Sequence, residues 1–538
     1  MKNTLFIFSS LFFILCGNVT QAQVQRPKLV VGIVIDQMRW DYLYRYNDVF
    51  KPNGGFKRML NQGFTCENTF IPYTPTVTAA GHTCVYTGSV PAVHGIVGNG
   101  WWDKIKNKNV YCTDDDTAHT VGSNTKAGQM SPRNMFATTI GDELRLATNF
   151  KTKVIGVAIK DRGAILPAGH AATAAYWYDY KTGDFITSTY YMSQLPAWAK
   201  TFNARKMVDS LYKLNWNISL PKETYLKYST ADQKLYENKP LDSTQLGFPY
   251  DLTRFINKDY GKIASTPYGN TLTEAMAEAA VKAENLGRNT VTDFLAVSFS
   301  SPDYIGHAFG PNSWEQLDNY ARLDETLGKF FAFLDAHVGV GNYTVFLTAD
   351  HGVAHVPNFS IENKLPGGAF KESALIKKMN DALKQKVVKD IDNYFVVFDD
   401  HLIDSAKLNK EEIIKWSVDY LLQQPEIAQA FDIRDLVTTP LTAKQKEMIS
   451  NGYLPSRCGD VQVILKPGYV GGNGNGTSHG LWNPYDSHIP LLWYGWGIKH
   501  GKTNKETYMT DIAATLAAML HIQMPSGCVG HVIEEVMK

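Results

Sequence analysis

The segment Tyr343–Gly352, Tyr-Thr-Val-Phe-Leu-Thr-Ala-Asp-His-Gly, joins a strand pattern to two side chains that are costly to bury. Its first six residues are β-branched, aromatic or leucine, which predicts a strand inside a sheet. Asp350 and His351 follow at the carboxyl end, where α/β proteins bind ligands. A divalent metal would hold both groups, although a helix-capping aspartate and a surface histidine would explain this segment equally well.

The same pattern recurs near the beginning of the chain. Leu29–Ile35 is a continuous apolar run, typical of a parallel strand covered on both faces, and Asp36 follows it. Further along, Val291–Phe299 predicts a strand that leads into Asp303 and His307. These two residues are four apart, so a helix would place them on one face at a spacing common in metal chelation.

A glycine-rich loop supplies a further histidine. Gly471–Gly480 ends in Thr-Ser-His-Gly and presents His479, and no Gly-Lys-Ser/Thr follows that would indicate a phosphate-binding P-loop. His488 lies just before the predicted strand Ile489–Trp493 and is the rival for the same role. The chain has 14 histidines, so most must be structural.

A nucleophile is expected in the stretch from Ile71 to Gly88. Thr78 stands where a helix could begin, and backbone N–H groups at a helix N-terminus favour an anion. A lone threonine at this place is more often only a helix cap. The spacing leaves Thr74, Thr76 and Thr78 all open as candidates.

Candidate anion-binding residues follow. Asn99 lies in a glycine-flanked turn, where it could donate to a ligand or simply adopt a left-handed conformation. The predicted strand Val154–Ile159 leads into Lys160, Asp161 and Arg162. If the chain stays extended, the two cations point one way and suit a multiply charged anion, although a solvated charge cluster is the commoner explanation.

The whole chain has 538 residues and a formal net charge of +1, which offers no basic field for nucleic acid. Residues 23–538 are interpreted as one catalytic domain with two insertions. The first, at about 170–270, is rich in aromatic and polar residues and resembles a cap, and the second, at about 359–450, is charged and helical.

Residues 1–22 are interpreted as a secretory signal peptide, with Lys2, an apolar run at Leu5–Leu15 and a candidate cleavage site at Ala22. Lipidation at Cys16 is the minor option. No other apolar run approaches ~20 residues, so no membrane segment is expected after cleavage and the predicted location is periplasmic or secreted. In an oxidising compartment some of the remaining cysteines should pair, with at least one left over: Cys66, Cys84, Cys112, Cys458 and Cys528.

Taken together, these motifs resemble the alkaline phosphatase superfamily. They look more closely like the phosphate-irrepressible, PafA-type bacterial alkaline phosphatases, which share the nucleotide pyrophosphatase/phosphodiesterase core. The resemblance covers essentially all of the mature chain. It implies an α/β fold, a three-layer sandwich with a central, mostly parallel sheet and inserted cap regions.

The resemblance also implies roles for individual residues. One zinc ion would be held by Asp303, His307 and His479. A second would be held by Asp36, Asp350 and His351, with Thr78 as the nucleophile that also contacts metal. The phosphoryl oxygens would be contacted by Asn99, Lys160 and Arg162.

The implied function is an exported, broad-specificity phosphomonoesterase that uses two Zn²⁺, with manganese as the alternative metal, and a covalent phosphothreonine. The alternative is a phosphodiesterase or nucleotide pyrophosphatase on the same metal core. A sulfatase lacks support because no Cys-x-Pro-x-Arg or Ser-x-Pro-x-Arg motif is present. A metal-independent binding module would leave the strand-end groups unexplained. The expected partners are small phosphate monoesters, and the oligomeric state is left open, with a monomer as one option.

Overall fold

The computed structural model describes residues 24–538, so the predicted signal peptide lies outside the described residues. A ten-stranded sheet in the order β18-β2-β17-β10-β1-β9-β6-β7-β8-β5 forms the main body. This mixed α/β architecture with a mostly parallel sheet confirms the predicted fold class. The strands are β1 Leu29–Ile35, β2 Phe64–Phe70, β5 Thr120–Val121, β6 Val154–Ala158, β7 Ala174–Asp179, β8 Asp184–Ser188, β9 Asp293–Phe299, β10 Tyr343–Thr348, β17 His488–Gly495 and β18 Gly501–Tyr508.

The centre of the sheet consists of four adjacent parallel strands, β10, β1, β9 and β6. Every residue of these strands is buried, as their apolar runs predict. Their register is level: Val34 of β1 lies opposite Thr348 of β10, and Ser298 of β9 lies opposite both Val34 and Ala158 of β6. The carboxyl ends of all four strands therefore meet at one edge.

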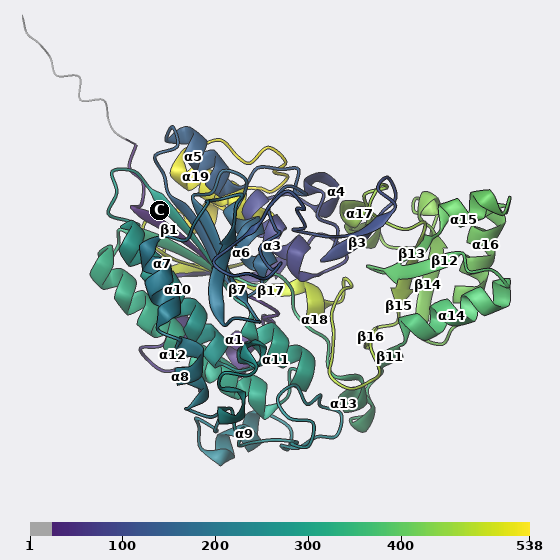
Figure 1. Cartoon of the computed structure of the whole chain (residues 1–538), viewed down its shortest axis with the longest axis horizontal. Coiled ribbons are helices and arrows are strands. Elements are labelled where there is room, and N and C mark those ends of the chain that lie inside the picture. Colours follow the sequence, from purple (N-terminus) through teal and green to yellow (C-terminus); the bar gives the residue numbers. More distant parts are fainter. Residues whose placement is uncertain (1–23) are drawn as a thin grey trace, which may run out of the picture.

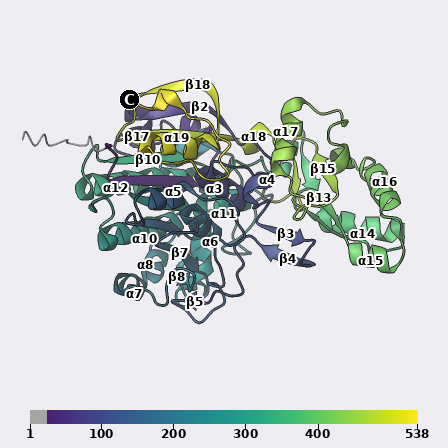
Figure 2. The same ribbon diagram turned by 90° about the horizontal axis from the view of Figure 1, so that it is seen from above.

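Helices cover both faces of the sheet and complete three layers (Figures 1 and 2). One helical layer contains α2, α10, α11 and α12, and the other contains α3, α5, α6 and α19. The bounds are α2 Gly55–Gln62, α3 Thr78–Thr87, α5 Ile140–Ala147, α6 Asp161–Ala168, α10 Tyr268–Glu284, α11 Ser301–Phe309, α12 Trp314–His337 and α19 Asp511–Leu520. The shorter helices are α1 Tyr42–Arg45, α4 Pro91–His94, α13 Pro357–Glu362 and α18 Pro484–Ser487.

The range predicted as the first insertion, about 170–270, opens with β7 and β8, which extend the main sheet. The irregular segment lies between Ser188, where β8 ends, and Tyr268, where α10 begins. It contains three short α-helices, α7 Ala197–Ala204, α8 Met207–Tyr212 and α9 Lys222–Tyr228, and two 3-10 helices at Thr253–Phe255 and Tyr260–Ser265. We call the segment between Ser188 and Tyr268 the cap segment.

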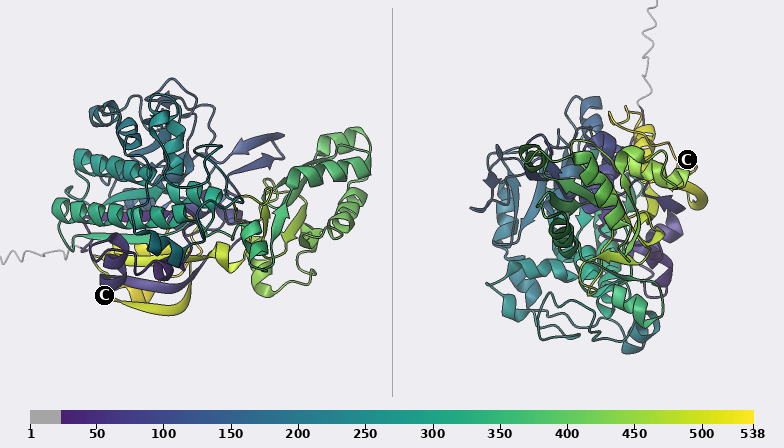
Figure 3. Two further views of the ribbon diagram at one scale, coloured as in Figure 1. Left: turned by 90° about the horizontal axis from the view of Figure 1, so that it is seen from below. Right: turned by 90° about the vertical axis from the view of Figure 1, so that its right-hand side faces the viewer.

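The second insertion forms a separate lobe, drawn in green in Figures 1 and 3. It is not purely helical, because an antiparallel sheet in the order β12-β13-β15-β14 builds its own apolar core. The parallel pair β11 and β16 marks where the chain leaves and returns, and the hairpin β3–β4 of the main body reaches toward the lobe. The bounds are β3 Gly100–Asp103, β4 Lys108–Tyr111, β11 Gly368–Phe370, α14 Glu372–Leu383, β12 Val388–Asp392, β13 Phe395–Phe398, α15 Asp400–Ser405, α16 Lys410–Leu421, β14 Ile427–Asp432, α17 Ala443–Gly452, β15 Val461–Leu465 and β16 Tyr469–Gly471.

The cysteines do not pair as expected from the sequence. Within residues 24–538 all five are free thiols, and four of them are buried. Four of them, Cys66, Cys84, Cys112 and Cys458, pack as small apolar residues in the hydrophobic core. Over the same residues, none of the helices combines the length and the apolar character needed to cross a membrane.

Buried carboxylates attach the cap segment to α12. Glu315, at the start of α12, is fully buried and accepts a hydrogen bond from the Tyr250 hydroxyl (2.7 Å). Glu237 of the cap segment is also buried, and one oxygen of each glutamate has no hydrogen-bond partner. Burial is the main reason that the pKa of Glu315 is raised to about 8.

The raised pKa of Glu315 predicts a stability that falls with rising pH. Between about pH 4 and pH 8 the folded state keeps a proton that the unfolded state loses. Glu315→Gln removes this difference and keeps an acceptor for Tyr250. Thermal unfolding should therefore show the variant gaining stability relative to the original protein from pH 5 to pH 8.5. An equal difference in Tm at both pH values would contradict this account.

Candidate metal centre

The four central strands deliver charged side chains to one edge of the sheet. Asp36 directly follows β1, Asp350 and His351 follow β10 after one residue, and Asp303 lies in the first turn of α11 after β9. Lys160 stands two residues beyond β6 and precedes α6. Because the strand ends are level, these side chains converge.

The first ligand group consists of Asp36, Asp350 and His351. One potential ligand atom from each lies within 4.8 Å of the other two, and all three side chains are fully buried. The Nε2 atom of His351 is 3.6 Å from Oδ1 of Asp36 and 3.5 Å from Oδ2 of Asp350. Oδ1 of Asp36 has no hydrogen-bond partner, although buried carboxylate oxygens normally have one.

The second ligand group is built around Asp303. Its Oδ1 atom is 3.1 Å from Nε2 of His307 and 3.9 Å from Nε2 of His479. The ligand atoms of Asp303, His351 and His479 also lie within 4.8 Å of one another, and the rings of His351 and His479 stack at 3.5 Å. The two groups are therefore immediate neighbours that meet at the His351 ring.

The three histidines share one protonation pattern. Nδ1 of each ring contacts a backbone carbonyl oxygen, which can only accept a hydrogen bond. Each Nδ1 must therefore carry the hydrogen, and the lone pair of each Nε2 is free to face the site. A metal-ligating histidine is usually fixed in this manner. The contacts run from His351 to Gly352 (2.9 Å), from His307 to Thr477 (2.7 Å) and from His479 to Thr76 (2.6 Å).

The charge balance of the centre calls for additional cations. Nζ of Lys160 lies 2.7 Å from Oδ2 of Asp36 and 2.6 Å from Oδ2 of Asp303, so one ammonium contacts two of the three buried carboxylates. Burial, and then the neighbouring Asp350, raise the pKa of Asp36 well above its ordinary value. Carboxylate oxygens and imidazole nitrogens are donors for divalent ions of the zinc type, and the residues fit two of them.

The threonines of the stretch from Ile71 to Gly88 differ in what their hydroxyls contact. Thr74 and Thr76 donate to backbone carbonyls of residues 480 and 481, at 3.1 and 3.2 Å. Thr78, the first residue of α3, instead lies 3.4 Å from Nε2 of His351 and 3.5 Å from Nζ of Lys160. Among these three, only Thr78 faces the ligand groups.

Asn99 contacts the residue that follows Thr78, and Arg162 lies two residues after Lys160. Oδ1 of Asn99 accepts the N–H of Ala79 (2.9 Å), so its amide N–H atoms remain available as donors. The expectation of an extended chain through Arg162 is wrong, because Lys160 caps α6 and Arg162 lies in its first turn. The guanidinium of Arg162 donates to the Tyr111 hydroxyl (2.9 Å), which restrains its orientation.

Comparison with known proteins defines the family. Residues 30–486 match the family described as type I phosphodiesterase / nucleotide pyrophosphatase. The chain belongs to this family. Alkaline phosphatase PhoV of Synechococcus elongatus is 51% identical over 524 residues, 97% of this chain and 95% of PhoV. A Myroides odoratus protein named calcium-transporting ATPase is 49% identical, covering 96% of each chain.

Alkaline phosphatase PafA of Elizabethkingia meningoseptica is 47% identical over 96% of this chain and 95% of its own. The crystal structure of wild-type PafA matches this fold with a TM-score of 0.93, over 96% of this chain and 100% of that one. A PafA variant with a threonine changed to serine, and an asparagine, a lysine and an arginine changed to alanine, matches at 0.92. The resemblance to PafA-type phosphatases is confirmed.

In this family member, Gln37 connects the two ligand groups, a role that sequence reasoning missed. Its backbone N–H donates to Oδ1 of Asp350 (3.0 Å), and its side-chain amide donates to Oδ1 of Asp303 (2.7 Å). Its φ of 66° makes this double contact possible. A Cβ on Gly306 would lie 1.9 Å from Oε1 of Gln37, so the glycine between Asp303 and His307 is needed for space. Two features of the sequence could have indicated this role of Gln37: its position directly after Asp36, and the glycine between Asp303 and His307.

The structure separates the two rival histidines. His479 lies at the centre, whereas His488 is the first residue of β17 and stacks between Trp40 (4.6 Å) and Phe70 (4.7 Å). Its Nε2 atom also contacts the backbone carbonyl of Glu67 (3.0 Å). His488 is therefore a packing residue.

This difference predicts the outcome of a metal analysis. His479→Ala should lower the amount of metal that copurifies with the protein, because it removes an Nε2 donor that lies 3.9 Å from Asp303. His488→Phe keeps the aromatic stack and should leave the metal content unchanged. Elemental analysis after gel filtration measures both variants. Equal metal loss from the two would exclude the assignment of His479.

Proposed function

We propose that this chain is an exported alkaline phosphatase that hydrolyses a broad range of phosphate monoesters through a covalent phosphothreonine. The observation that carries the proposal is Thr78, whose hydroxyl lies beside both His351 and Lys160 at the edge of two ligand groups. The enzyme class, phosphoric monoester hydrolase, follows from identities of 51% and 47% to proteins named alkaline phosphatase.

The chain's own residues would act as follows. Asp36, Asp350 and His351 would hold one Zn²⁺, and Asp303, His307 and His479 the other. When bound, two such ions would favour the threonine alkoxide and neutralise negative charge on the leaving oxygen. Thr78 would release its hydroxyl proton to solvent, and its Oγ would form a bond to phosphorus as the ester P–O bond breaks. The leaving oxygen would take a proton from water.

A second displacement would complete the reaction. Water would attack the phosphothreonine from the side that the leaving group had occupied, breaking the bond to Thr78 and releasing inorganic phosphate. A proton of that water would restore the Thr78 hydroxyl. Two in-line displacements give net retention at phosphorus. The position of Thr78 at the N-terminus of α3 supports this step, because helix N–H groups favour the phosphoryl charge there.

Substrate preference would depend on three donors around Thr78. The amide of Asn99, the ammonium of Lys160 and the guanidinium of Arg162 together suit the three nonbridging oxygens of a monoester dianion. Burial lowers the pKa of Lys160, but Asp303 and Asp36 outweigh it, so the net pKa is raised and the ammonium stays charged. The four residue types changed in the PafA variant stand in the same order along that chain.

Two finer parts of the proposal have separate support. Zinc is favoured over manganese because three of the six protein ligands are imidazoles. Export into the periplasm or the medium rests on the signal-like pattern of residues 1–22. The alternative, a phosphodiesterase on the same metal core, is favoured by the family description. Comparing a monoester with a diester as substrate distinguishes the two functions.

Removal of the nucleophile is the first test of this function. With zinc present, Thr78→Ala should lower kcat/KM for 4-nitrophenyl phosphate by a factor on the order of 10³ or more, because only direct attack by water remains. Thr76→Ala is the matched control and should keep most of the activity. If Thr78→Ala were as active as the control, Thr78 would not be the nucleophile.

The donors around the phosphoryl group give a second test. Lys160→Ala and Arg162→Ala should each reduce phosphate release from 4-nitrophenyl phosphate about 10- to 100-fold, as expected for a lost charge-assisted hydrogen bond. Hydrolysis of bis-4-nitrophenyl phosphate should fall less, because a diester carries one charge fewer. Steady-state kinetics on both esters measures this. A larger loss on the diester would favour the phosphodiesterase alternative.

A further inference from the structure

The centre reaches the surface at His307. The side chain of His307 is 37% exposed, whereas those of the other five ligand residues are at most 6% exposed. Thr78 lies against the His351 group, and in an in-line displacement the leaving oxygen stands opposite the nucleophile. If the chain acts as the proposed phosphatase, the leaving group therefore lies on the side of the metal centre where His307 is and extends past this residue toward the surface.

A groove of about 740 Å³ begins at His307. Its walls come from Asn238 of the cap segment, from residues 370–374 of the lobe and from the glycine loop at residues 471–478. Hydrogen bonds join the glycine loop and the cap segment to α11 at His307. The N–H of Thr477 donates to the His307 carbonyl (2.9 Å), and the N–H of Asn238 donates to the Ala308 carbonyl (2.8 Å). We call this space the His307 groove.

The walls of the His307 groove are polar and nearly neutral. Lys371 and Glu372 oppose one another in charge, and the other polar groups are amides and hydroxyls such as those of Asn473 and Ser373. The Glu372 carboxylate reaches toward the glycine loop, since its Oε1 would lie 3.5 Å from a Cβ on residue 471. The side-chain Oδ1 of Asn473 accepts the N–H of residue 475 (3.0 Å), which leaves the side-chain N–H atoms of Asn473 as donors.

We propose that the His307 groove binds the polyhydroxylated leaving group of a sugar phosphate. Hydroxyl groups both donate and accept, which matches a wall of amides, hydroxyls, one ammonium and one carboxylate. A second phosphate would need several unopposed cations. A nucleobase would need an exposed aromatic face to stack on, but Phe370 is fully buried and the exposed ring of the groove, His307, is assigned to the metal.

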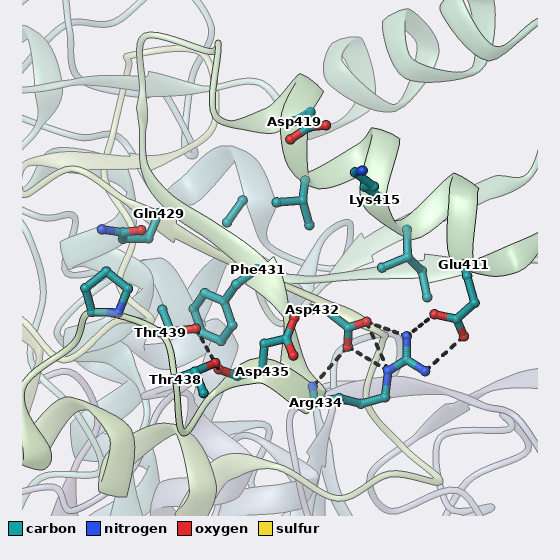
Figure 4. A pocket seen from close by; sticks show the side chains of 14 residues that line it. Glu411, Lys415, Asp419, Gln429, Phe431, Asp432, Arg434, Asp435, Thr438 and Thr439 are labelled. Atoms are coloured by element: carbon teal, nitrogen blue, oxygen red, sulfur yellow. Dashed lines mark hydrogen bonds and ion pairs between the residues drawn. The ribbon is translucent and has the colours of Figure 1, made fainter.

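A second polar groove in the same lobe provides the control. It has a volume of about 610 Å³ and lies between α16 and β14 (Figure 4). It includes none of the metal ligands, and its arginine, Arg434, is bound by Asp432 and Glu411. Lys415 lines this groove and can be changed without touching the His307 groove.

The test compares two alkyl phosphates, glucose 6-phosphate and 2-methoxyethyl phosphate, on the zinc-loaded enzyme. The readout is the ratio of kcat/KM for the sugar phosphate to that for the simple ester. Intrinsic reactivity cancels when this ratio is compared between proteins. In the double variant Glu372→Ala/Asn473→Ala the ratio should fall about tenfold, the effect of losing one to two hydrogen bonds. Lys415→Ala should keep the original ratio.

Three outcomes would overturn the inference. If the double variant keeps a ratio within twofold of the original, the groove does not bind the hydroxyl groups of the sugar, even if kcat/KM falls for both esters. An equal fall in Lys415→Ala would show that the effect is not local. If the original enzyme released phosphate from neither ester, the proposed phosphatase function would fail, and the groove assignment with it.

Discussion

The burial of three carboxylates beside a single lysine is the constraint on which the rest of the centre depends. Asp36, Asp303 and Asp350 are removed from water, and the Lys160 ammonium contacts the first two of them. Such a cluster is unfavourable without further positive charge. It can exist here because four parallel strands end level, with every strand residue buried, so that the apolar sheet supports the polar edge.

Backbone groups around the centre hold the ligands in place. Three histidines from separate segments each donate Nδ1–H to a carbonyl. Two of these segments are joined by Asp486: its carboxylate accepts the N–H groups of Gly480 and Leu481, and its carbonyl accepts that of Gly352. The glycine loop is therefore fixed near its ligand despite its composition. The main body carries the chemistry, and the cap segment and lobe shape the access to it.

Local patterns in the sequence predicted much of this arrangement. The strands Leu29–Ile35 and Tyr343–Thr348 have the predicted bounds, because long apolar runs need no partner to be recognised. The strands β2 and β18, of which β18 lies at the edge of the sheet, were not predicted: their sequences are polar, and pairing with neighbours makes them strands. Within the range 359–450, the strands β12, β13 and β14 were missed because that range was interpreted as charged and helical. The expected disulfides are absent from residues 24–538, because thiol distances depend on the fold.

The sequence by itself determined the buried central strands and the donor types at their ends, because both follow from short-range periodicity and residue chemistry. Only the tertiary structure decided which of three threonines faces the ligand groups, which of two histidines joins them, and that Gln37 bridges them. These choices depend on strand register and helix packing between residues up to about 400 positions apart. No local pattern encodes such distances, since each is the outcome of packing the whole sheet at once.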